Sequence, residues 1–278
     1  MLYLIFAMRV EAKKIIKHFN LKKVSDKPFE VYEGKNINLI ISGVGKINSS
    51  AATAYLLKDI KVDHNDLDYI INIGICGTLN ENFNVGDLVL INKIRDYKRK
   101  KNYYPDIIFK HFLKEGSIQS IDYINTEYET EEDLVDMESS SIFYTASKFL
   151  NTHQIHCLKV VSDVAKDKNN TEKISKNFVE ELIEKNLIKI VEFIYSIAHF
   201  QEKFQLVLSK KEIEIINKIS KKLKLTFSQK KQFENAYYYY KTKNHQEPNF
   251  IQEFLYIVPN NKSERDVIFE SLKKQLFS

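Results

Sequence analysis

Carboxylate side chains occupy positions in this sequence where they could act as acids or bases. Asp136 and Glu138 begin a stretch whose apolar residues recur at helical spacing, and Asp163 follows soon after the apolar run Cys157–Val161. Such a run is typical of a strand buried on both faces, and open α/β sheets bind their ligands at the carboxyl ends of the strands. We therefore expect these acids to line one pocket.

Each acid also has a structural explanation. Carboxylates at a helix start complement the helix dipole and cap free amides, and for Asp136 this interpretation is as good as a functional one. It fits Glu138 and Asp163 less well, because small residues follow Glu138 and Asp163 ends a hydrophobic strand. Glu11 falls in the first turn of a predicted helix after the strand Leu2–Ala7, so it either complements the dipole or acts in catalysis.

Two glycine segments could bring the backbone close to a bound ligand. Ser42–Ala52 holds Gly43 and Gly45 before a helix rich in small residues, and the amides at such a helix start can hold an anion or sugar oxygens. Gly74–Gly77 is predicted to end the strand Tyr69–Ile73 in a second loop, where glycine permits close approach. The Ser42–Ala52 segment matches neither a dinucleotide fingerprint nor a complete phosphate loop.

These residues need a framework of strands and helices. Strands are predicted over residues 2–7, 29–32, 37–42, 69–73, 85–91, 118–125 and 157–161, with 29–32 and 37–42 forming a hairpin. Helices are predicted after residue 8, after residue 45, from residue 136 and over residues 172–200, and segment 95–116 is predicted as a loop with a short helix. Helices over residues 210–223, 228–240, 249–257 and 263–277 complete the chain, with Ser263 as a cap.

Length and composition limit the class of protein. The chain has 278 residues, of which 44% are hydrophobic, and this suffices for one large α/β domain and a smaller appendage. No apolar run reaches the length of a membrane span and no secretory signal precedes the first strand, so we expect a cytoplasmic protein.

Cys76 and Cys157 make no disulfide framework and are predicted to be buried thiols. His153 and His156 lack the neighbours of a metal site, and we expect neither a metal nor a cofactor.

The positive charge of the chain is concentrated in its last part. Residues 201–278 carry fifteen Lys and Arg against nine Asp and Glu, a balance of +6, whereas the whole chain sums to +5. A basic module could bind nucleic acid, and the tyrosines of Ala236–Lys241 could stack on single-stranded bases. Solvated lysine-rich helices with aromatic residues in their core are the favoured interpretation, and nucleic-acid binding is the less favoured one.

Six short sequence blocks carry a resemblance to a known family. They are Ala7–Glu11, Ser42–Asn48, Ile71–Gly74, Val85–Asp87, Val135–Ser139 and Val161–Ala165. Their order is that of the nucleoside phosphorylase family, and over residues 1–200 the chain most resembles its branch of 5′-methylthioadenosine/S-adenosylhomocysteine nucleosidases. Residues 205–278, the predicted helical extension, lie outside the resemblance and have no assigned role.

The resemblance implies a fold and an activity for residues 1–200. The fold is a three-layer α/β/α architecture with a central mixed sheet, to which the predicted helices over residues 205–278 add a small all-α domain. The activity is cleavage of the N-glycosidic bond of a purine nucleoside, a small-molecule substrate. The family usually assembles as dimers or larger oligomers, so we expect a homodimer.

The resemblance also implies roles for individual residues. Glu11 matches the glutamate that activates the attacking water, and Asp163 matches the acid that protonates the purine at N7. Met137 and Glu138 match the ribose site, where the glutamate accepts hydrogen bonds from the 2′ and 3′ hydroxyls. The other predicted substrate-binding residues are Ser162, which precedes the acid, Tyr123 and Ile124 at the base, and Gly45, Gly74 and Ile75 in the glycine segments.

Departures from the family pattern leave the substrate open. The stretch between Asp87 and Tyr123, which helps to shape the pocket for the 5′ substituent, is shorter than in a typical nucleosidase, and Ile75–Thr78 is bulkier than the family's glycine-rich loop. We see no arginine set for phosphate, which favours hydrolysis of an adenosine-like, 5′-modified nucleoside over phosphorolysis. A further alternative is a nucleoside-binding module whose basic tail binds nucleic acid or a protein partner.

Overall fold

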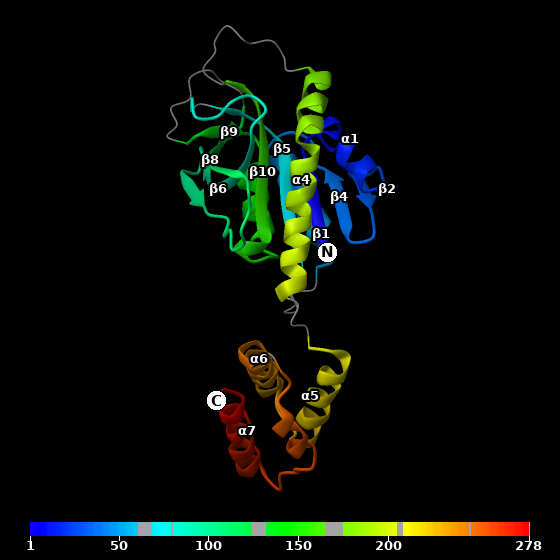
Figure 1. Ribbon diagram of the computed structural model, residues 1–278, viewed down its shortest axis with the longest axis vertical. Helices are drawn as coiled ribbons and strands as arrows, with labels where there is room; N and C mark the ends of the chain where they lie inside the picture. The colour runs from blue at the N-terminus through cyan, green and yellow to red at the C-terminus, as the bar shows by residue number, and fades with distance from the viewer. Residues whose placement is uncertain are drawn as a thin grey trace. The chain divides into compact units, whose positions relative to one another are not determined.

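The structure of the chain is a computed structural model, which Figure 1 shows. It describes residues 1–60, 68–78, 80–123, 132–164, 175–204, 208–244 and 246–277. The chain divides into two units, residues 1–200 and residues 201–278. The predicted site residues fall in the first unit, and one of them, Ile124, lies outside the described residues.

The apolar runs of the first unit form one mixed sheet. Its strands are β1 (Leu2–Phe6), β2 (Lys22–Ser25), β3 (Glu30–Glu33), β4 (Ile37–Ile41), β5 (Tyr69–Thr78), β6 (Leu88–Asp96), β7 (Lys101–Tyr103), β8 (Lys114–Ser120), β9 (Leu134–Asp136) and β10 (Ile155–Val164). The pairing order is β10-β6-β8-β9-β5-β1-β4-β3-β2, with β7 on β6. Because β10 also pairs with β5, the strands β5, β9, β8, β6 and β10 close into a ring, and β1, β4, β3 and β2 extend the sheet beyond it.

Parallel neighbours determine where the chemistry can lie. β1 pairs in parallel with β4 and β5, and β5 pairs in parallel with β10. The carboxyl ends of these strands therefore meet at one edge of the sheet, where open α/β sheets bind their ligands. Glu11 follows β1, Gly45 follows β4, and Asp163 lies near the end of β10.

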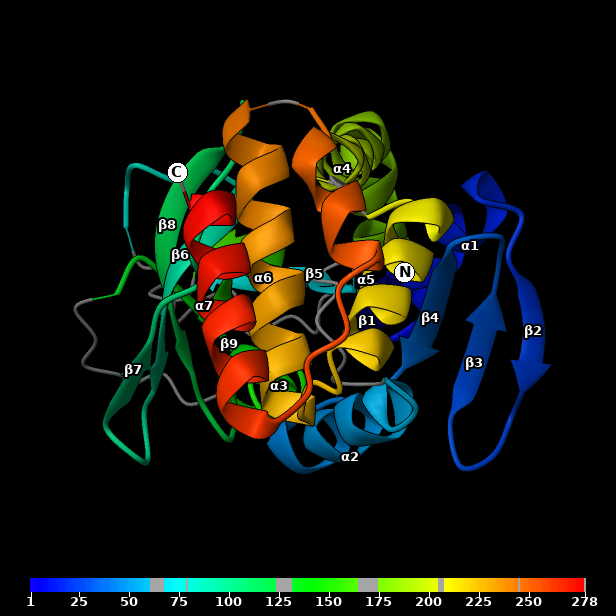
Figure 2. The same cartoon turned by 90° about the horizontal axis from the view of Figure 1, so that it is seen from below.

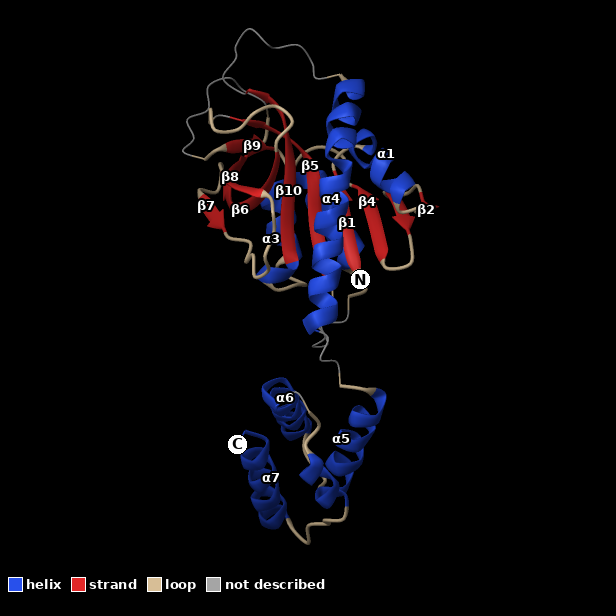
Figure 3. Ribbon diagram, in the orientation of Figure 1, coloured by secondary structure: helices blue, strands red, loops and turns tan. Residues whose placement is uncertain are grey.

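Helices cover both faces of the sheet. α1 (Arg9–His18) and α4 (Lys176–Phe204) pack on one face, and α2 (Lys46–Leu57) and α3 (Ser139–Ala146) pack on the other, while the short η1 (Thr152–Gln154) leads into β10. In Figures 1 and 3, α4 crosses in front of the sheet and α3 lies behind it, and Figure 2 shows α2 on the side away from α4. The predicted three-layer α/β/α fold with a mixed sheet is confirmed.

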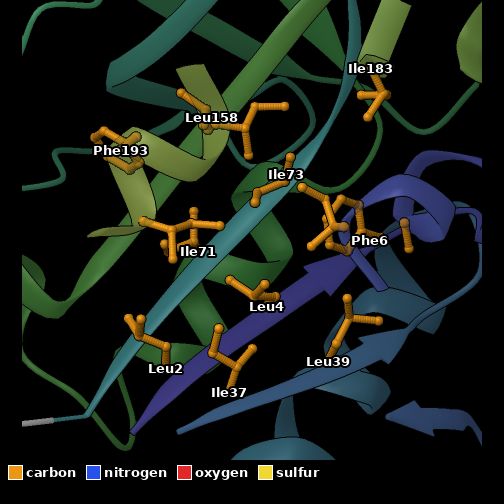
Figure 4. Close-up of a cluster of buried hydrophobic side chains, with 14 of the residues drawn as sticks. Leu2, Leu4, Phe6, Ile37, Leu39, Ile71, Ile73, Leu158, Ile183 and Phe193 are labelled. Carbon is orange, nitrogen blue, oxygen red and sulfur yellow. The ribbon is translucent and has the colours of Figure 1, made fainter. Parts of the chain in front are cut away.

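Side chains along β1 alternate between two cores. Leu4 and Phe6 point into the core under α1 and α4, whereas Ile5 points into the core under α2 and α3. Figure 4 shows the first of these cores, where Phe193 of α4 joins the strand residues. Since successive strand residues face opposite sides of a sheet, a strand with two covered faces must be apolar throughout.

One predicted loop is instead part of a strand. The prediction that Gly74–Gly77 forms a loop is wrong, because β5 continues through these residues. Gly74 pairs with Lys159 of β10, and Gly77 pairs with Val135 of β9. Partners on both sides take up the backbone hydrogen bonds that keep a glycine-containing stretch extended.

The predicted helix within residues 95–116 is also wrong. This segment holds the end of β6, all of β7 and the start of β8, and no helix is assigned to it within the described residues 80–123. Ile107, Phe109 and Leu113 pack against the core under α1 and α4. Apolar contact with that core, and not helical periodicity, orders the segment.

The second unit is all-helical, as predicted. It contains α5 (Lys210–Lys222), α6 (Phe227–Asn244), the 3₁₀ segment η2 (Asn249–Leu255) and α7 (Lys262–Phe277). Ser209 caps α5, because its hydroxyl accepts a hydrogen bond from the Glu212 amide at 3.2 Å. The predicted cap Ser263 lies inside α7 instead, and the side chain of Asn261 accepts from the Glu264 amide at 2.9 Å.

Two further features follow from burial and helix length. Cys76 in β5 and Cys157 in β10 are both buried and unpaired, as predicted. Burial raises the pKa of the Cys157 thiol to about 11, which keeps it protonated at neutral pH. Among the helices that the structure describes, none is long and apolar enough to cross a membrane.

Replacing Ile190 of α4 by alanine is expected to lower the free energy of unfolding of the first unit by about 2–5 kcal/mol, because this fully buried side chain would leave a cavity. Ile188→Ala on the same helix is the matched control, since Ile188 is 73% exposed and its loss should change that free energy by about 0.5 kcal/mol or less. Urea unfolding followed by circular dichroism measures both variants. Equal destabilisation by the two would contradict the assigned core face of α4.

Candidate active site

Glu11 lies at the edge of the sheet where β1 ends. It is in the first turn of α1, yet only 1% of the residue is exposed. One carboxylate oxygen accepts a hydrogen bond from the Met8 amide at 2.8 Å, and the other accepts from the Ile75 amide at 3.0 Å. The first bond caps the start of α1 and the second ties α1 to β5. Burial raises the pKa of Glu11 above its ordinary value, while Lys159 and the backbone amides oppose this rise.

Gly74 leaves room for the Glu11 carboxylate. A Cβ atom at position 74 would lie 3.0 Å from Glu11 Oε1 and 3.5 Å from Lys159 Nζ. Any side chain here would therefore force the carboxylate to move. The same distances locate Glu11 and Lys159 beside one backbone position of β5.

Lys159 is a buried cation paired with a buried anion. It lies within the apolar strand β10 with 2% of the residue exposed, and its ammonium lies 3.0 Å from Asp136 Oδ2. Asp136 also accepts hydrogen bonds from the Ser120 hydroxyl at 2.6 Å and from the Ser139 amide at 2.9 Å. Burial by itself would raise the pKa of Asp136, but Lys159 and the serine hydroxyls hold it below its ordinary value. Burial would likewise lower the pKa of Lys159, but Asp136 raises it above the ordinary value.

Glu138 joins the starts of two helices. It precedes α3, is 7% exposed, and its Oε1 accepts a hydrogen bond from the Gly45 amide at 2.8 Å. Gly45 precedes α2 with a φ of 95°, a conformation that favours glycine. Burial, followed by repulsion from Asp136, raises the pKa of Glu138 to about 7, against the opposing charge of Lys159. Glu11 adds a smaller repulsion.

Asp163 follows a β-bulge near the end of β10. Val161 is paired with Cys76 and Asp163 with the next residue of β5, so Ser162 is the extra residue of the bulge. The Ser162 hydroxyl lies 3.0 Å from the carbonyl oxygen of Cys76 and 2.5 Å from Asp163 Oδ1. Asp163 itself is partly buried.

The structure brings seven of the ten predicted site residues into three contacting sets. The contacting sets are Glu11 with Gly74 and Ile75, Gly45 with Glu138, and Ser162 with Asp163. Electrostatic coupling between Glu11 and Glu138 links the first two sets. All of these residues belong to the edge of the sheet that the parallel strands define.

The other predicted site residues are not members of these contacting sets. Met137 is partly buried next to Glu138. Tyr123 lies beyond the end of β8 and is 68% exposed. Ile124 lies outside the described residues. Binding of a base by Tyr123 and Ile124 therefore stays a prediction.

Sequence reasoning missed Lys159 and the ion pair that it makes. The signal was present, because Lys159 is a single lysine within the buried strand Ile155–Val164, and a buried ammonium needs an anionic partner. Asp136 also accepts from the first amide of α3, which agrees with its interpretation as a helix cap.

The histidine pair belongs to an aromatic cluster. His153 and His156 lie against the Tyr69 ring, with ring centroids 6.4 Å and 5.9 Å away. Over the part of the chain that the structure describes, no group of three or more His, Cys, Asp or Glu side chains is arranged to hold a metal ion.

Part of the chain is similar in sequence to known proteins. Residues 2–120 match the family model of the phosphorylase superfamily. The resemblance to the nucleoside phosphorylase family is confirmed. Among similar proteins, the 5′-methylthioadenosine/S-adenosylhomocysteine nucleosidase of Bacillus pumilus is 39% identical over 67 residues, and that of Haemophilus ducreyi is 38% identical over 72 residues. Each alignment covers 24% of this chain and only 27% and 29% of the respective relative.

Solved structures show the same fold over a longer span. The 5′-methylthioadenosine/S-adenosylhomocysteine nucleosidase of Neisseria meningitidis, in complex with methylthio-immucillin-A, has a TM-score of 0.56 at 23% identity and covers 68% of this chain and 97% of its own. The futalosine hydrolase of Helicobacter pylori has a TM-score of 0.54 at 19% identity, over 71% of this chain and 97% of its own. At such identities the similarity establishes the fold alone.

Lys159→Met is expected to lower the free energy of unfolding by about 3–5 kcal/mol, because Asp136 would become an unpaired buried charge. The double variant Lys159→Met/Asp136→Asn removes that charge, so it should recover part of the loss. Urea unfolding measures both, with Lys22→Met as the control at an exposed lysine. A single variant as stable as this control would contradict the assigned ion pair.

Glu138 should make stability depend on pH. Between the ordinary carboxyl value of 4.5 and the folded value of about 7, the folded protein keeps a proton that the unfolded chain has lost. The contribution of Glu138 to the free energy of unfolding is therefore full below pH 4.5. It falls by about 3 kcal/mol as pH rises from 4.5 to about 7, and it stays constant at higher pH. Glu138→Gln should remove this dependence. Unfolding at several pH values tests it, and the same pH dependence in both proteins would contradict the assignment.

Proposed function

We propose that the first unit is a nucleosidase, which hydrolyses the N-glycosidic bond of a purine nucleoside. The observation that carries the proposal is the convergence of Glu11, Glu138 and Asp163 on the carboxyl edge of the sheet, each in a different environment. Similarity to proteins named as 5′-methylthioadenosine/S-adenosylhomocysteine nucleosidases and as a futalosine hydrolase supports this class of reaction.

The reaction needs carboxyl groups in different protonation states. When the glycosidic bond breaks, positive charge develops on the sugar and negative charge on the departing base. An ionised carboxylate can accept a proton from the attacking water, and a protonated carboxyl can give one to the base. The same division of roles operates between the two carboxyls of glycosidases.

Glu11 is proposed as the base that activates water. Each of its oxygens accepts one backbone amide, and a carboxylate oxygen can accept a second hydrogen bond, so acceptor capacity remains for a water molecule. Lys159 favours the ionised form of Glu11. Burial raises the pKa of Glu11 above its ordinary value, which makes the carboxylate a stronger proton acceptor.

Glu138 is proposed to hold the ribose hydroxyls. When ionised it is an acceptor only, and the Gly45 amide occupies one of its oxygens. The two hydroxyls of a ribose could bind to its remaining lone pairs. Since the pKa of Glu138 is about 7, nucleoside binding should strengthen as pH rises through this value.

Asp163 is proposed as the acid that protonates the base. The Ser162 hydroxyl has one hydrogen, and its two neighbours are the Cys76 carbonyl, which can only accept, and Asp163. The hydroxyl can therefore donate to the carbonyl or to Asp163, and in either case Ser162 holds the Asp163 carboxyl near the end of β10.

Hydrolysis is favoured over phosphorolysis because the nearby lysines already have partners. Lys159 is paired with Asp136, and Lys46 lies 3.2 Å from Asp96 and 3.3 Å from Asp122. A phosphate dianion would have to compete with these carboxylates for both cations. Water needs no such site.

Other parts of the proposal depend on the resemblance to the family. We propose an adenosine-like nucleoside with a modified 5′ position as the substrate, bound through Met137, Ser162, Tyr123 and Ile124 in addition to the acids. A homodimer is the proposed assembly and the cytoplasm the proposed location.

The test measures release of free base from 5′-methylthioadenosine, S-adenosylhomocysteine and inosine, each with and without phosphate. We expect release that does not depend on phosphate and that falls by about 10²–10⁴-fold in Asp163→Asn and in Glu11→Gln, because each change removes one acid or base.

Asp26→Asn is the matched control, since Asp26 is 73% exposed and lies in the connection between β2 and β3, outside the site. It should retain the wild-type rate within about 2-fold. Release that requires phosphate would replace hydrolysis by phosphorolysis. Failure to release base from any of the three nucleosides would contradict the proposed activity on this substrate class.

A further inference from the structure

A stripe of lysines runs along the exposed side of α5 in the second unit. Lys211, Lys218 and Lys222 are all exposed, and their spacing puts them on one face of a helix with 3.6 residues per turn. With a rise of 1.5 Å per residue, the stripe is about 16 Å long. The adjoining face of α5 is buried in the core of the unit through Ile216, Ile219 and Leu223.

Some other lysines of the unit have their charges paired. Lys241 lies 2.8 Å from Glu212, and Lys273 lies 2.7 Å from Glu270. Within residues 208–244 and 246–277, by contrast, no acidic side chain forms an ion pair with a lysine of the stripe. This holds even for the exposed Glu214, which lies on the same face between Lys211 and Lys218. The stripe therefore offers free cations to a ligand.

An exposed aromatic ring stands at one end of the stripe. Tyr256 follows η2, which packs against α5, and is 83% exposed. Lys222 Nζ lies 5.9 Å from the centroid of its ring. The orange segment that contains η2 lies beside α5 in Figures 1 and 2.

The tyrosine run of α6 does not have the same character. Ala236 and Tyr237 are fully buried in the core of the unit, and Tyr239 packs against Phe277 with ring centroids 5.3 Å apart. The core interpretation of that run is thus correct for its first residues. Tyr256, which the sequence pattern did not single out, is the more exposed ring.

We propose that the second unit binds single-stranded nucleic acid along α5. Phosphates would lie against Lys211, Lys218 and Lys222, and one base would stack on Tyr256. Proteins that bind single strands without sequence preference combine a cationic track with aromatic platforms in this way. The +6 balance of residues 201–278 would attract the strand over a longer range.

A single strand fits these features better than other anionic partners. A duplex keeps its bases stacked inside, so an exposed ring would add little to its binding. A bilayer surface would call for apolar side chains next to the lysines, and on the exposed side of α5 the only large apolar residue among those described is Ile213, at 44% exposure.

The test is fluorescence anisotropy of a labelled oligo(dT) with the full chain, at salt concentrations from about 50 to 200 mM. We expect affinity to fall with salt. The variant Lys211→Gln/Lys218→Gln/Lys222→Gln should lose about 10-fold or more in affinity at the lowest salt, and its slope of log affinity against log salt should be smaller by about 2, for three phosphate contacts. Tyr256→Ala should lose about 5-fold or more with no change in slope.

The matched control removes the same charge elsewhere. Lys22→Gln/Lys35→Gln/Lys98→Gln changes three exposed lysines of the first unit. Equal weakening by the two triple variants would overturn the proposal, since binding would then follow net charge alone. Absence of oligo(dT) binding by the wild-type chain would also overturn it.

Vesicles that contain phosphatidylserine distinguish a lipid surface from a nucleic acid. Vesicle binding that depends on the lysine stripe, together with failure to bind oligo(dT), would assign this surface to membranes and overturn the proposal. Circular dichroism of every variant confirms that the helices are intact, so a loss of binding reports the surface and not unfolding.

Discussion

The ion pair between Lys159 and Asp136 is the interaction on which the first unit depends. Two charges taken out of water stabilise a protein only when their geometry and hydrogen bonds compensate for lost hydration. Here Lys159 comes from β10 and Asp136 from the end of β9, and both strands pair with β5. The pair therefore spans the strand between its members, and it does so beside Gly74, where no side chain intervenes.

One cation serves several carboxylates. Asp136 forms the ion pair with Lys159, and it also accepts hydrogen bonds from serine hydroxyls. For Glu11 and Glu138, burial raises the pKa more than the positive charge of Lys159 lowers it. Burial and this one lysine together leave Asp136 with a lowered pKa and the other two acids with raised pKa values. Glu138, whose pKa is about 7, can hold or release a proton near neutral pH.

The sequence predicts the layers of the fold because apolar runs and helical periodicity are local signals. It predicts Glu11 and Asp163 near one edge because each follows or ends a strand of the parallel part of the sheet. The role of Glu138 came from the resemblance to the family, and the strand before it, β9, is antiparallel to β5. It does not predict that β5 continues past Gly74, since the partners that hold those glycines extended come from β9 and β10, far along the chain. The ion pair of Lys159 was missed for a similar reason: its partner, Asp136, ends β9, a strand that is not adjacent to β10.

The closed ring of strands also has a consequence for the order in which the chain can fold. β5 and β6 are made early, but the strand that lies between them is β10, which pairs with both. Until residues 155–164 have left the ribosome, β5 and β6 each present an unpaired apolar edge, the type of surface that associates with other chains. The edges of β5 and β6 are thus protected from aggregation only after β10, which is synthesised later, has paired with them.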